Sequence, residues 1–241
     1  MSGLNNPKIP QPKITVTGRI PDAGLDLLRS IDGSDVWAWM DDAVIPTEVR
    51  NEQLADADAA VTLLTDRVDD DFLAAAPKLQ IVANVAVGYN NIDVDACTRR
   101  GVIVTNTPGV LIDATADLAM GLVLMSTRRL GEAERLIRSG TAWQWSMFMM
   151  LGTGLQGRTL GIVGMGGIGE ALATRARAFG MRIVYHNRRN VDTEVEQRLD
   201  AQRVDFDELL ATSDIVSLNC PYSEATHHLI DASALAAMKS S

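Results

Sequence analysis

The sequence has little of several residue types that define specialised protein classes. Cysteine occurs only twice among 241 residues, as Cys97 and Cys220, with no metal-ligand spacing around either, so neither a disulfide framework nor a metal site is expected. The longest apolar run, residues 119–125, is too short to cross a bilayer. Residues 1–13 are polar and lack an apolar h-region, which argues against a secretory signal. These absences predict a cytoplasmic location without a membrane partner.

Positive charge is also in deficit. There are 22 Lys and Arg against 31 Asp and Glu, which gives a net charge of -9 and argues against nucleic acid as the main partner. A small anionic substrate is still compatible, because a local cationic pocket can override the global charge. The remaining composition, 46% hydrophobic and 22% charged, is ordinary for a globular chain long enough for two modest domains.

Short apolar runs alternate with helical patterns from Lys13 onward, which predicts an α/β fold with parallel sheets covered on both faces. In the first part of the chain we expect strands at residues 13–18, 36–40, 59–64, 79–84 and 102–105, with helices at 21–31, 48–54, 70–75 and 94–100. After them come two helices, 110–127 and 130–139, and a loop rich in Trp and Met. The pattern then resumes with strands at 159–164, 182–186 and 215–219 and helices at 167–180 and 207–212. A domain boundary near residues 106–109 divides the chain into 1–105 and 106–241.

A glycine-rich motif marks the start of the second α/β segment. Residues 164–169 read Gly-Met-Gly-Gly-Ile-Gly, a GxGxxG that follows an apolar strand and opens a helix. In such a motif Gly164 permits a tight turn, Gly166 lets the backbone approach a pyrophosphate, and Gly169 lets helix and strand pack closely. The backbone at Gly167 and Ile168 then belongs to a helix start that binds phosphate. The alternative is a glycine turn without a ligand.

A basic turn follows about twenty residues later. Asn187, Arg188 and Arg189 lie at the end of the next expected strand, where an NAD site has a carboxylate, and no carboxylate occurs before Asp192. Two guanidiniums suit a 2′-phosphate, so we expect NADP(H) to be preferred, with NAD(H) as the alternative cofactor. The other interpretation is a solvated basic turn.

Three segments together resemble the D-isomer-specific 2-hydroxyacid dehydrogenases. The loop VGYNNID at residues 87–93 is similar to the family's VGxDNID, and residues 105–119 are similar to its TNTPGV…ATAD crossover helix. Residues 155–164 resemble the family's run into the nucleotide fold. The Asn-Arg-Arg turn and residues 226–241 look most like the NADPH-dependent glyoxylate/hydroxypyruvate and 2-ketogluconate reductases.

The resemblance implies a flavodoxin-like substrate lobe, a Rossmann cofactor domain, and interconversion of a small 2-keto acid and a D-2-hydroxy acid. Backbone amides at Val87 and Gly88 would hold the substrate carboxylate, unless this is only a structural turn. Cys220, Pro221 and Thr226 would line the nicotinamide side. Residues 110–127 and 143–151 would build a homodimer, unless they are simply core.

Thr115, on the crossover helix, has two interpretations. Either it faces the cofactor, or its hydroxyl bonds back to its own helix. The chain also departs from the family pattern at two positions, because Asn90 replaces a usual Asp and Gly167 replaces a usual Arg.

The family's catalytic residues have no counterpart here. Its mechanism uses an Arg, a Glu and a His, and the Arg lies in an N-x-x-R-G segment shortly after a Met-Lys pair. This sequence ends at Met238-Lys239-Ser240-Ser241, and we assign no catalytic role to His186, His227 or His228. We therefore expect an incomplete Rossmann sheet and a chain truncated before its catalytic segment. The alternatives are a non-catalytic dinucleotide-binding or dimerisation module, resembling relatives that act in transcriptional corepression, or an inactive fragment.

Overall fold

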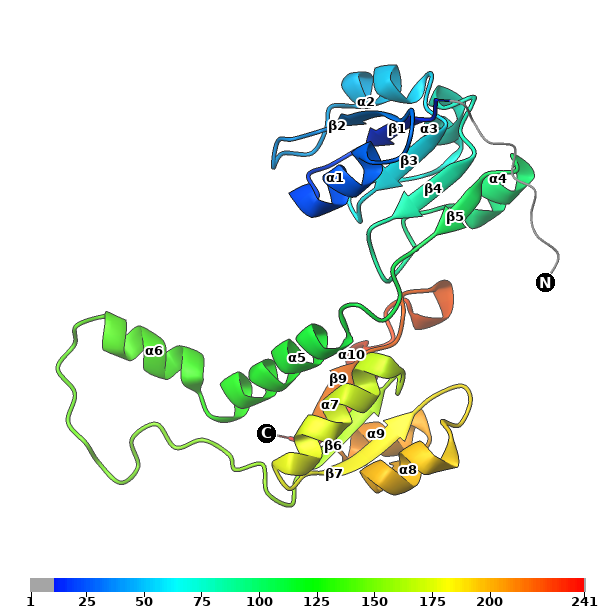
Figure 1. Cartoon of the computed structure of the whole chain (residues 1–241). Helices are drawn as coiled ribbons and strands as arrows, with labels where there is room; N and C mark the ends of the chain where they lie inside the picture. Colours follow the sequence, from blue (N-terminus) through cyan, green and yellow to red (C-terminus); the bar gives the residue numbers. More distant parts are fainter. Residues whose placement is uncertain (1–10, 241) are drawn as a thin grey trace. The chain divides into compact units, whose positions relative to one another are not determined.

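The computed structural model describes residues 11–240, which divide into two compact units (Figure 1), the first ending at Pro108 and the second beginning at Gly109. Most of the polar N-terminal segment judged not to be a secretory signal lies outside the described residues, as does Ser241. Among residues 11–240, no helix combines the length and apolar character that crossing a bilayer would require.

The first unit is a five-stranded parallel sheet in the order β2-β1-β3-β4-β5. This order is that of a flavodoxin-like doubly wound fold. The strands are β1 (Lys13–Val16), β2 (Asp35–Ala38), β3 (Ala59–Thr62), β4 (Ile81–Asn84) and β5 (Ile103–Thr105). The helices are α1 (Asp22–Arg29), α2 (Thr47–Leu54), α3 (Asp70–Ala75) and α4 (Val94–Arg99). Each expected strand and helix is present, with ends that differ by at most two residues.

Apolar side chains on both faces of this sheet explain why it is covered on both sides. Val16 and Leu25 belong to one buried cluster, which joins α1 to the sheet. Phe72 and Val82 belong to the other, which joins α2, α3 and α4 to the opposite face. Two aspartates begin helices on this second side: the side chain of Asp69 accepts hydrogen bonds from two α3 amides, and that of Asp93 from one α4 amide.

The second unit is a four-stranded parallel sheet in the order β8-β7-β6-β9. This matches strands 3-2-1-4 of a Rossmann sheet. Its strands are β6 (Thr159–Val163), β7 (Arg182–His186), β8 (Ala201–Arg203) and β9 (Ile215–Leu218). Its helices are α5 (Ile112–Thr127), α6 (Leu130–Arg138), α7 (Gly167–Ala178), α8 (Thr193–Leu199), α9 (Phe206–Thr212) and α10 (Ala232–Ala237), with a 3-10 turn η1 (Glu224–Thr226).

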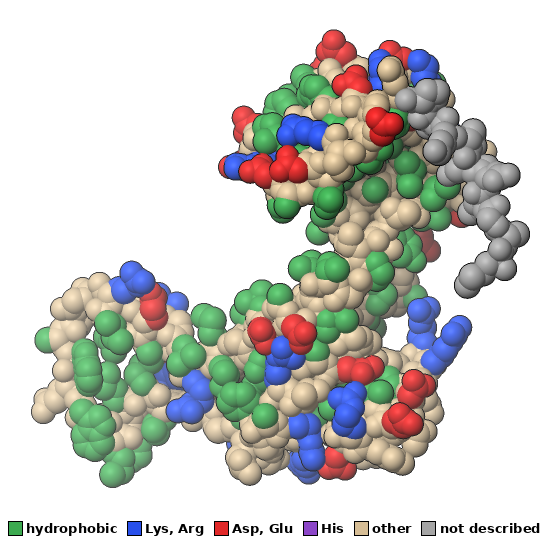
Figure 2. Space-filling view, in the orientation of Figure 1, with side chains coloured by type: hydrophobic (Ala, Val, Ile, Leu, Met, Phe, Trp, Pro, Cys, Tyr) green, Lys and Arg blue, Asp and Glu red, His purple; other side chains and the backbone are tan. Residues whose placement is uncertain are grey.

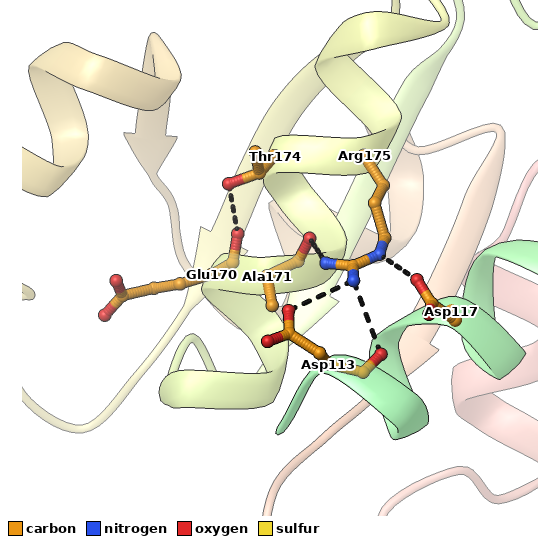
Figure 3. Close-up of polar contacts among 6 residues, drawn as sticks. All are labelled: Asp113, Asp117, Glu170, Ala171, Thr174 and Arg175. Carbon is orange, nitrogen blue, oxygen red and sulfur yellow. Dashed lines mark hydrogen bonds and ion pairs between the residues drawn. The ribbon is translucent and has the colours of Figure 1, made fainter. Parts of the chain in front are cut away.

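Helix α5 is held against α7 by both packing and charge. Ala116, Met120 and Val123 are buried in the cluster that also contains the core of β6 and α7. At the start of α5, the Arg175 guanidinium donates to Asp117 at 2.6 Å and to Asp113 at 3.1 Å (Figure 3). These bonds, that to Asp117 first, raise the pKa of Arg175. Asp113 and Asp117 therefore fix how two helices meet, besides facing the positive end of α5.

The segment after α5 leaves the body of the second unit. Arg129 takes a left-handed backbone conformation (φ 55°) between α5 and α6, and no α6 residue is buried. Figure 1 shows α6 and the following strand-free segment reaching away from the sheet, and Figure 2 shows hydrophobic side chains gathered on them. Gly140, which follows α6, has φ 66°, as expected for a residue that ends a helix.

Candidate dinucleotide and carboxylate sites

The glycine loop joins β6 to α7, and its three motif glycines have three different surroundings. Gly164 has φ 96°, and a Cβ built there would lie 2.5 Å from the Cys220 amide nitrogen, so only glycine fits. A Cβ at Gly169 would lie 2.5 Å from the Gly164 carbonyl oxygen, which shows how closely α7 packs on the strand. A Cβ at Gly166 would meet nothing within 4 Å, so the backbone there faces open space.

This arrangement fits a dinucleotide. The open backbone at Gly166 lies at the first turn of α7, whose N-terminal amides and positive end attract phosphate. A Cβ at Gly167 would lie 2.7 Å from the Ile112 side chain of α5. A larger residue at position 167, such as the arginine usual in the family motif, would therefore require Ile112 to move.

A cleft of about 920 Å³ opens between the glycine loop and the ends of β7 and β9. Its lining includes most of the cofactor-site residues expected from the sequence: Gly164, Gly166, Asn187, Arg188, Arg189, Cys220, Pro221 and Thr226. All of them lie at the carboxyl edge of one parallel sheet, where such folds bind ligands. Gly167, Ile168, Gly169 and Thr115 are outside the lining. Gly167 and Gly169 instead mediate packing.

Asn187 connects the two halves of the cleft. Its side-chain oxygen accepts from the Met165 amide at 2.7 Å, and its side-chain nitrogen donates to the Met165 carbonyl at 3.2 Å. The basic turn is thereby tied to the glycine loop. This use of the amide differs from a direct cofactor contact, and sequence spacing alone gave no sign of it.

The two arginines of the turn are exposed to the cleft. Both Arg188 and Arg189 line it, and the ion pairs that the described part of this unit contains use other arginines. Neither guanidinium is therefore committed to a carboxylate within 4 Å among residues 11–240. Two uncommitted guanidiniums beside a glycine loop at a helix N-terminus suit an anionic group.

The loop after β9 forms the opposite wall. Thr226 caps η1: its hydroxyl accepts from the Ser223 amide at 2.7 Å and donates to the Pro221 carbonyl at 2.9 Å. The hydroxyl thus shapes the loop that carries Cys220 and Pro221. Thr115 is exposed on α5, and within the described range its hydroxyl makes no bond back to the helix. The hydroxyl of Thr127, at the other end of α5, does bond back, to Val123 at 2.7 Å.

The loop with Val87 and Gly88 lies in the first unit, after β4. Its carbonyls are held by side-chain amides: Asn106 donates to the Val87 carbonyl at 2.8 Å, and Asn84 to the Gly88 carbonyl at 3.0 Å. Val87 and Gly88 are exposed residues, and their amide N–H groups have no acceptor among residues 11–240. Fixed carbonyls with free, adjacent N–H groups are a suitable arrangement for an anion.

A buried polar network fixes this loop from below. Asn84 is 1% exposed and accepts from Thr62, while Asn91 donates to the carbonyls of Leu63 and Asp66. The Asp66 carboxylate, 5% exposed, accepts from the Thr17 hydroxyl at 2.6 Å and from the Leu63 amide at 2.7 Å. Each buried group is satisfied, so the network rigidifies the ends of three strands. Sequence analysis missed Asn84, Asp66 and Asn106, although Asn84 follows a buried strand.

The three histidines are engaged in local contacts. The His186 ring lies 3.1 Å from the Val204 carbonyl, and the His227 ring lies 3.2 Å from the Tyr222 hydroxyl. His228 stacks on His227 with ring centroids 3.7 Å apart. Within the described chain, none of the three histidines forms an ion pair with a carboxylate. A catalytic imidazole in this chemistry is oriented by such a carboxylate.

Comparison with known proteins decides the family. The family model of the D-isomer specific 2-hydroxyacid dehydrogenase NAD binding domain matches residues 120–241. The glyoxylate reductase of Thermococcus litoralis is 46% identical over 234 residues, which are 95% of this chain and 70% of the relative. The chain belongs to the D-isomer specific 2-hydroxyacid dehydrogenase family.

Solved structures of the family agree in fold. A protein from Thermus thermophilus superposes with a TM-score of 0.87 at 37% identity, covering 94% of this chain and 70% of that one. A glyoxylate reductase from Paecilomyes thermophila superposes with a TM-score of 0.83 at 35% identity, covering 96% and 71%. The fold and the membership of a 2-hydroxyacid dehydrogenase family expected from the sequence are confirmed. The matched family model is that of an NAD binding domain, so a nicotinamide dinucleotide is the cofactor class that the comparison supports for the second unit.

Proposed function

We propose that this 2-hydroxyacid dehydrogenase homologue binds NADP(H) in preference to NAD(H) and takes a small 2-keto acid of the glyoxylate type. The observation that carries the proposal is the cleft itself, where the glycine loop and two uncommitted arginines share one sheet edge. The names of relatives such as the Thermococcus litoralis enzyme support the substrate class.

Each part of the dinucleotide has residues that suit it. The α7 N-terminus and the open backbone at Gly166 would hold the pyrophosphate. Arg188 and Arg189 would pair with a 2′-phosphate, and their planar forks suit its oxygens better than a lysine would. Cys220 and Pro221 would border the nicotinamide end of the cleft, and Thr226 would hold their loop in place. When bound, the nicotinamide supplies the hydride.

The 2-keto acid needs a carboxylate site, and the amides of Val87 and Gly88 provide one. Their carbonyls are held away by Asn106 and Asn84, so the N–H groups are presented without competition from the loop itself. The alternative, a turn that is purely structural, does not explain why two side chains hold the carbonyls while the amides have no acceptor among the residues described.

The catalytic step requires groups that this sequence does not match. No residue corresponds to the Arg, Glu or His of the family pattern, and the histidines present make other contacts. We propose that the 241 residues bind dinucleotide and carboxylate but do not by themselves polarise the keto oxygen or deliver the proton.

The exposed apolar surface of α5, α6 and the segment after them supports a further proposal, a homodimer. Leu118, Leu122 and Met125 lie on one side of α5 and are 48–65% exposed, while the opposite side packs on α7. Trp143, Trp145 and Phe148 are 57–80% exposed on the neighbouring segment. A monomer does not usually expose such a surface, and a second copy would offer the same apolar side chains.

The test of cofactor choice is a fluorescence titration of the 241-residue chain with NADPH and with NADH. We expect NADPH to bind more tightly, and the double substitution Arg188→Ala/Arg189→Ala to remove the preference, at a cost of about 1–3 kcal/mol for the lost charged hydrogen bonds. Arg182, an exposed arginine at the opposite end of β7, gives the matched control: Arg182→Ala should change neither affinity. Equal affinities in the unsubstituted chain would refute the assignment.

A further inference from the structure

The basic turn that carries Arg188 and Arg189 is held at both ends by two side chains outside the cleft lining. At its start, the guanidinium of Arg203 donates to the Asn187 carbonyl through Nη2 at 3.0 Å and Nε at 3.3 Å. At its end, the Val191 amide donates to the Tyr185 hydroxyl at 3.3 Å. These two attachments bracket the two arginines.

The two bracketing residues are neighbours in the sheet. Tyr185 on β7 pairs in register with Arg203 on β8, so their side chains leave the same face at the same height. Tyr185 is fully buried, and its hydroxyl donates to Glu196 of α8 at 2.6 Å. The hydroxyl is therefore fixed by one bond while it accepts from the turn with the other. Arg203 is exposed, so it forms its two hydrogen bonds to the Asn187 carbonyl at the protein surface.

Restraint of this kind matters for a phosphate site built on two flexible side chains. Ordering an arginine costs side-chain entropy, and a mobile backbone beneath it adds to that cost. A turn already fixed at Asn187 and Val191 limits the cost to the side chains. Fixing binding groups before the ligand arrives is a general route to higher affinity.

We propose that Arg203, with Tyr185, is a positioning residue that sets the preference for the 2′-phosphate, by holding the turn that presents Arg188 and Arg189. The inference rests on the proposed NADP(H) preference. It assigns to β8, whose sequence carries no cofactor motif, an influence on which dinucleotide binds, exerted through the turn.

The experiment compares NADPH and NADH affinities of the 241-residue chain by fluorescence titration for Arg203→Met, Arg203→Lys and Tyr185→Phe. We expect Arg203→Met to weaken NADPH about five- to tenfold and NADH less than twofold, because only the 2′-phosphate uses the turn. Arg203→Lys keeps the charge but lacks the fork, and should recover only a minor part. Tyr185→Phe should weaken NADPH about threefold. Arg182→Met, which removes a matched charge from the other end of β7, should change nothing.

Each outcome is decisive. Arg203→Met that keeps the NADPH preference, while Arg188→Ala/Arg189→Ala loses it, overturns the positioning role and leaves the proposed function standing. Full recovery by Arg203→Lys overturns it as well, because charge alone would then suffice. Equal weakening of NADPH and NADH would show a merely structural residue and also reject the proposal. Equal affinities in the unsubstituted chain would overturn the proposed function, and this inference with it. Melting temperatures within a few degrees confirm that the variants fold.

Discussion

Individual glycines form much of the candidate dinucleotide site. Because their surroundings differ, substitutions at different glycines should separate effects on folding from effects on ligand binding. At Gly164 φ is 96°, and the Cys220 amide nitrogen lies only 2.5 Å from where a Cβ would be. Gly164→Ala should destabilise the chain by about 2 kcal/mol or more, because neither conflict can be relieved by moving a side chain. A urea unfolding series measures this change. An alanine variant as stable as the parent would contradict the close approach of these two loops.

Gly166→Ala is the matched substitution for the ligand. Its backbone is extended (φ -99°, ψ -164°) and nothing lies within 4 Å of a Cβ, so stability should change by less than about 0.5 kcal/mol. NADPH affinity should nevertheless fall at least about tenfold, since the methyl group would occupy the approach to the pyrophosphate. Unchanged affinity would show that the dinucleotide does not pass over this position.

At the scale of residues, the sequence indicates those parts of the candidate site that belong to motifs of fixed spacing. The motif glycines lie in the turn between β6 and α7, and Arg188 and Arg189 line the cleft, while their cofactor contacts stay predictions. Contacts between segments distant in sequence could not be predicted. The Asn187 bond to Met165, the Asn106 bond to Val87 and the Arg203 bond to Asn187 each depend on strand register, which a single sequence does not specify.

At the scale of elements, one carboxylate connects several segments of the second unit. Asp214, in the turn between α9 and β9, accepts from the Thr159 amide at 2.8 Å, from Lys239 at 3.1 Å and from Arg158 at 3.4 Å. Burial acts to raise the pKa of Asp214, but the Thr159 amide and Lys239 outweigh it and lower that pKa below 3.8. The ionised carboxylate therefore joins β6, β9 and the residues after α10.

Asp214→Asn should reduce the free energy of unfolding by about 1–2 kcal/mol at neutral pH, because the amide cannot pair with Lys239. A carboxyl group whose pKa is depressed in the folded state binds protons first in the unfolded state. Its stabilisation is thus complete above pH 3.8 and is lost as the pH falls through the lower, folded pKa. Urea denaturation of both proteins from pH 7 to pH 2.5 should show the difference shrinking in that acidic range. A constant difference would disprove the assignment.

Elements with strong periodicity were predicted closely, and weak ones were missed. Strand β7 and helix α3 were placed at their true ends. Helix α8 and strand β8 were not expected, since residues 193–203 are rich in charge and contain few apolar side chains. Only Leu199 of α8 is fully buried, and β8 is a three-residue edge strand. Tertiary pairing with β7 creates these elements, and local pattern does not reveal it.

For the whole molecule, the apolar surface of α5 and its neighbouring segment predicts association of two chains. Light scattering should give a dimer mass, and Leu122→Glu should shift it toward monomer, because a charge would be buried in the apolar contact. Leu122 is 56% exposed in the single chain, so the substitution should leave folding intact. Leu235→Glu on α10, at a similar 60% exposure, is the control and should remain dimeric. A monomer in the unsubstituted protein would count against the proposal.

Measuring the turnover of a 2-keto acid tests the function of the whole chain. In the proposed function, the residues described bind and position the ligands: the loop at Val87 and Gly88 would hold the carboxylate and the cleft would hold the dinucleotide, while the histidines are held in local contacts. Without a placed acid, proton delivery loses about 10²–10⁴-fold, and without a preorganised cation the developing charge on the keto oxygen has no partner. These losses are coupled and are not multiplied.

We therefore expect a polypeptide of these 241 residues to bind NADPH yet to turn over saturating glyoxylate, with NADPH or NADH, at least about a hundredfold more slowly than the Thermococcus litoralis relative does with whichever of the two cofactors it uses better. The measurement follows the absorbance of the reduced cofactor, and the binding titration run beside it shows that the protein is folded and loaded. Rates within tenfold of the relative would mean that catalytic groups lie among the 241 residues. His227 and His228 would then be the first to substitute, because they follow the loop that forms the cleft wall.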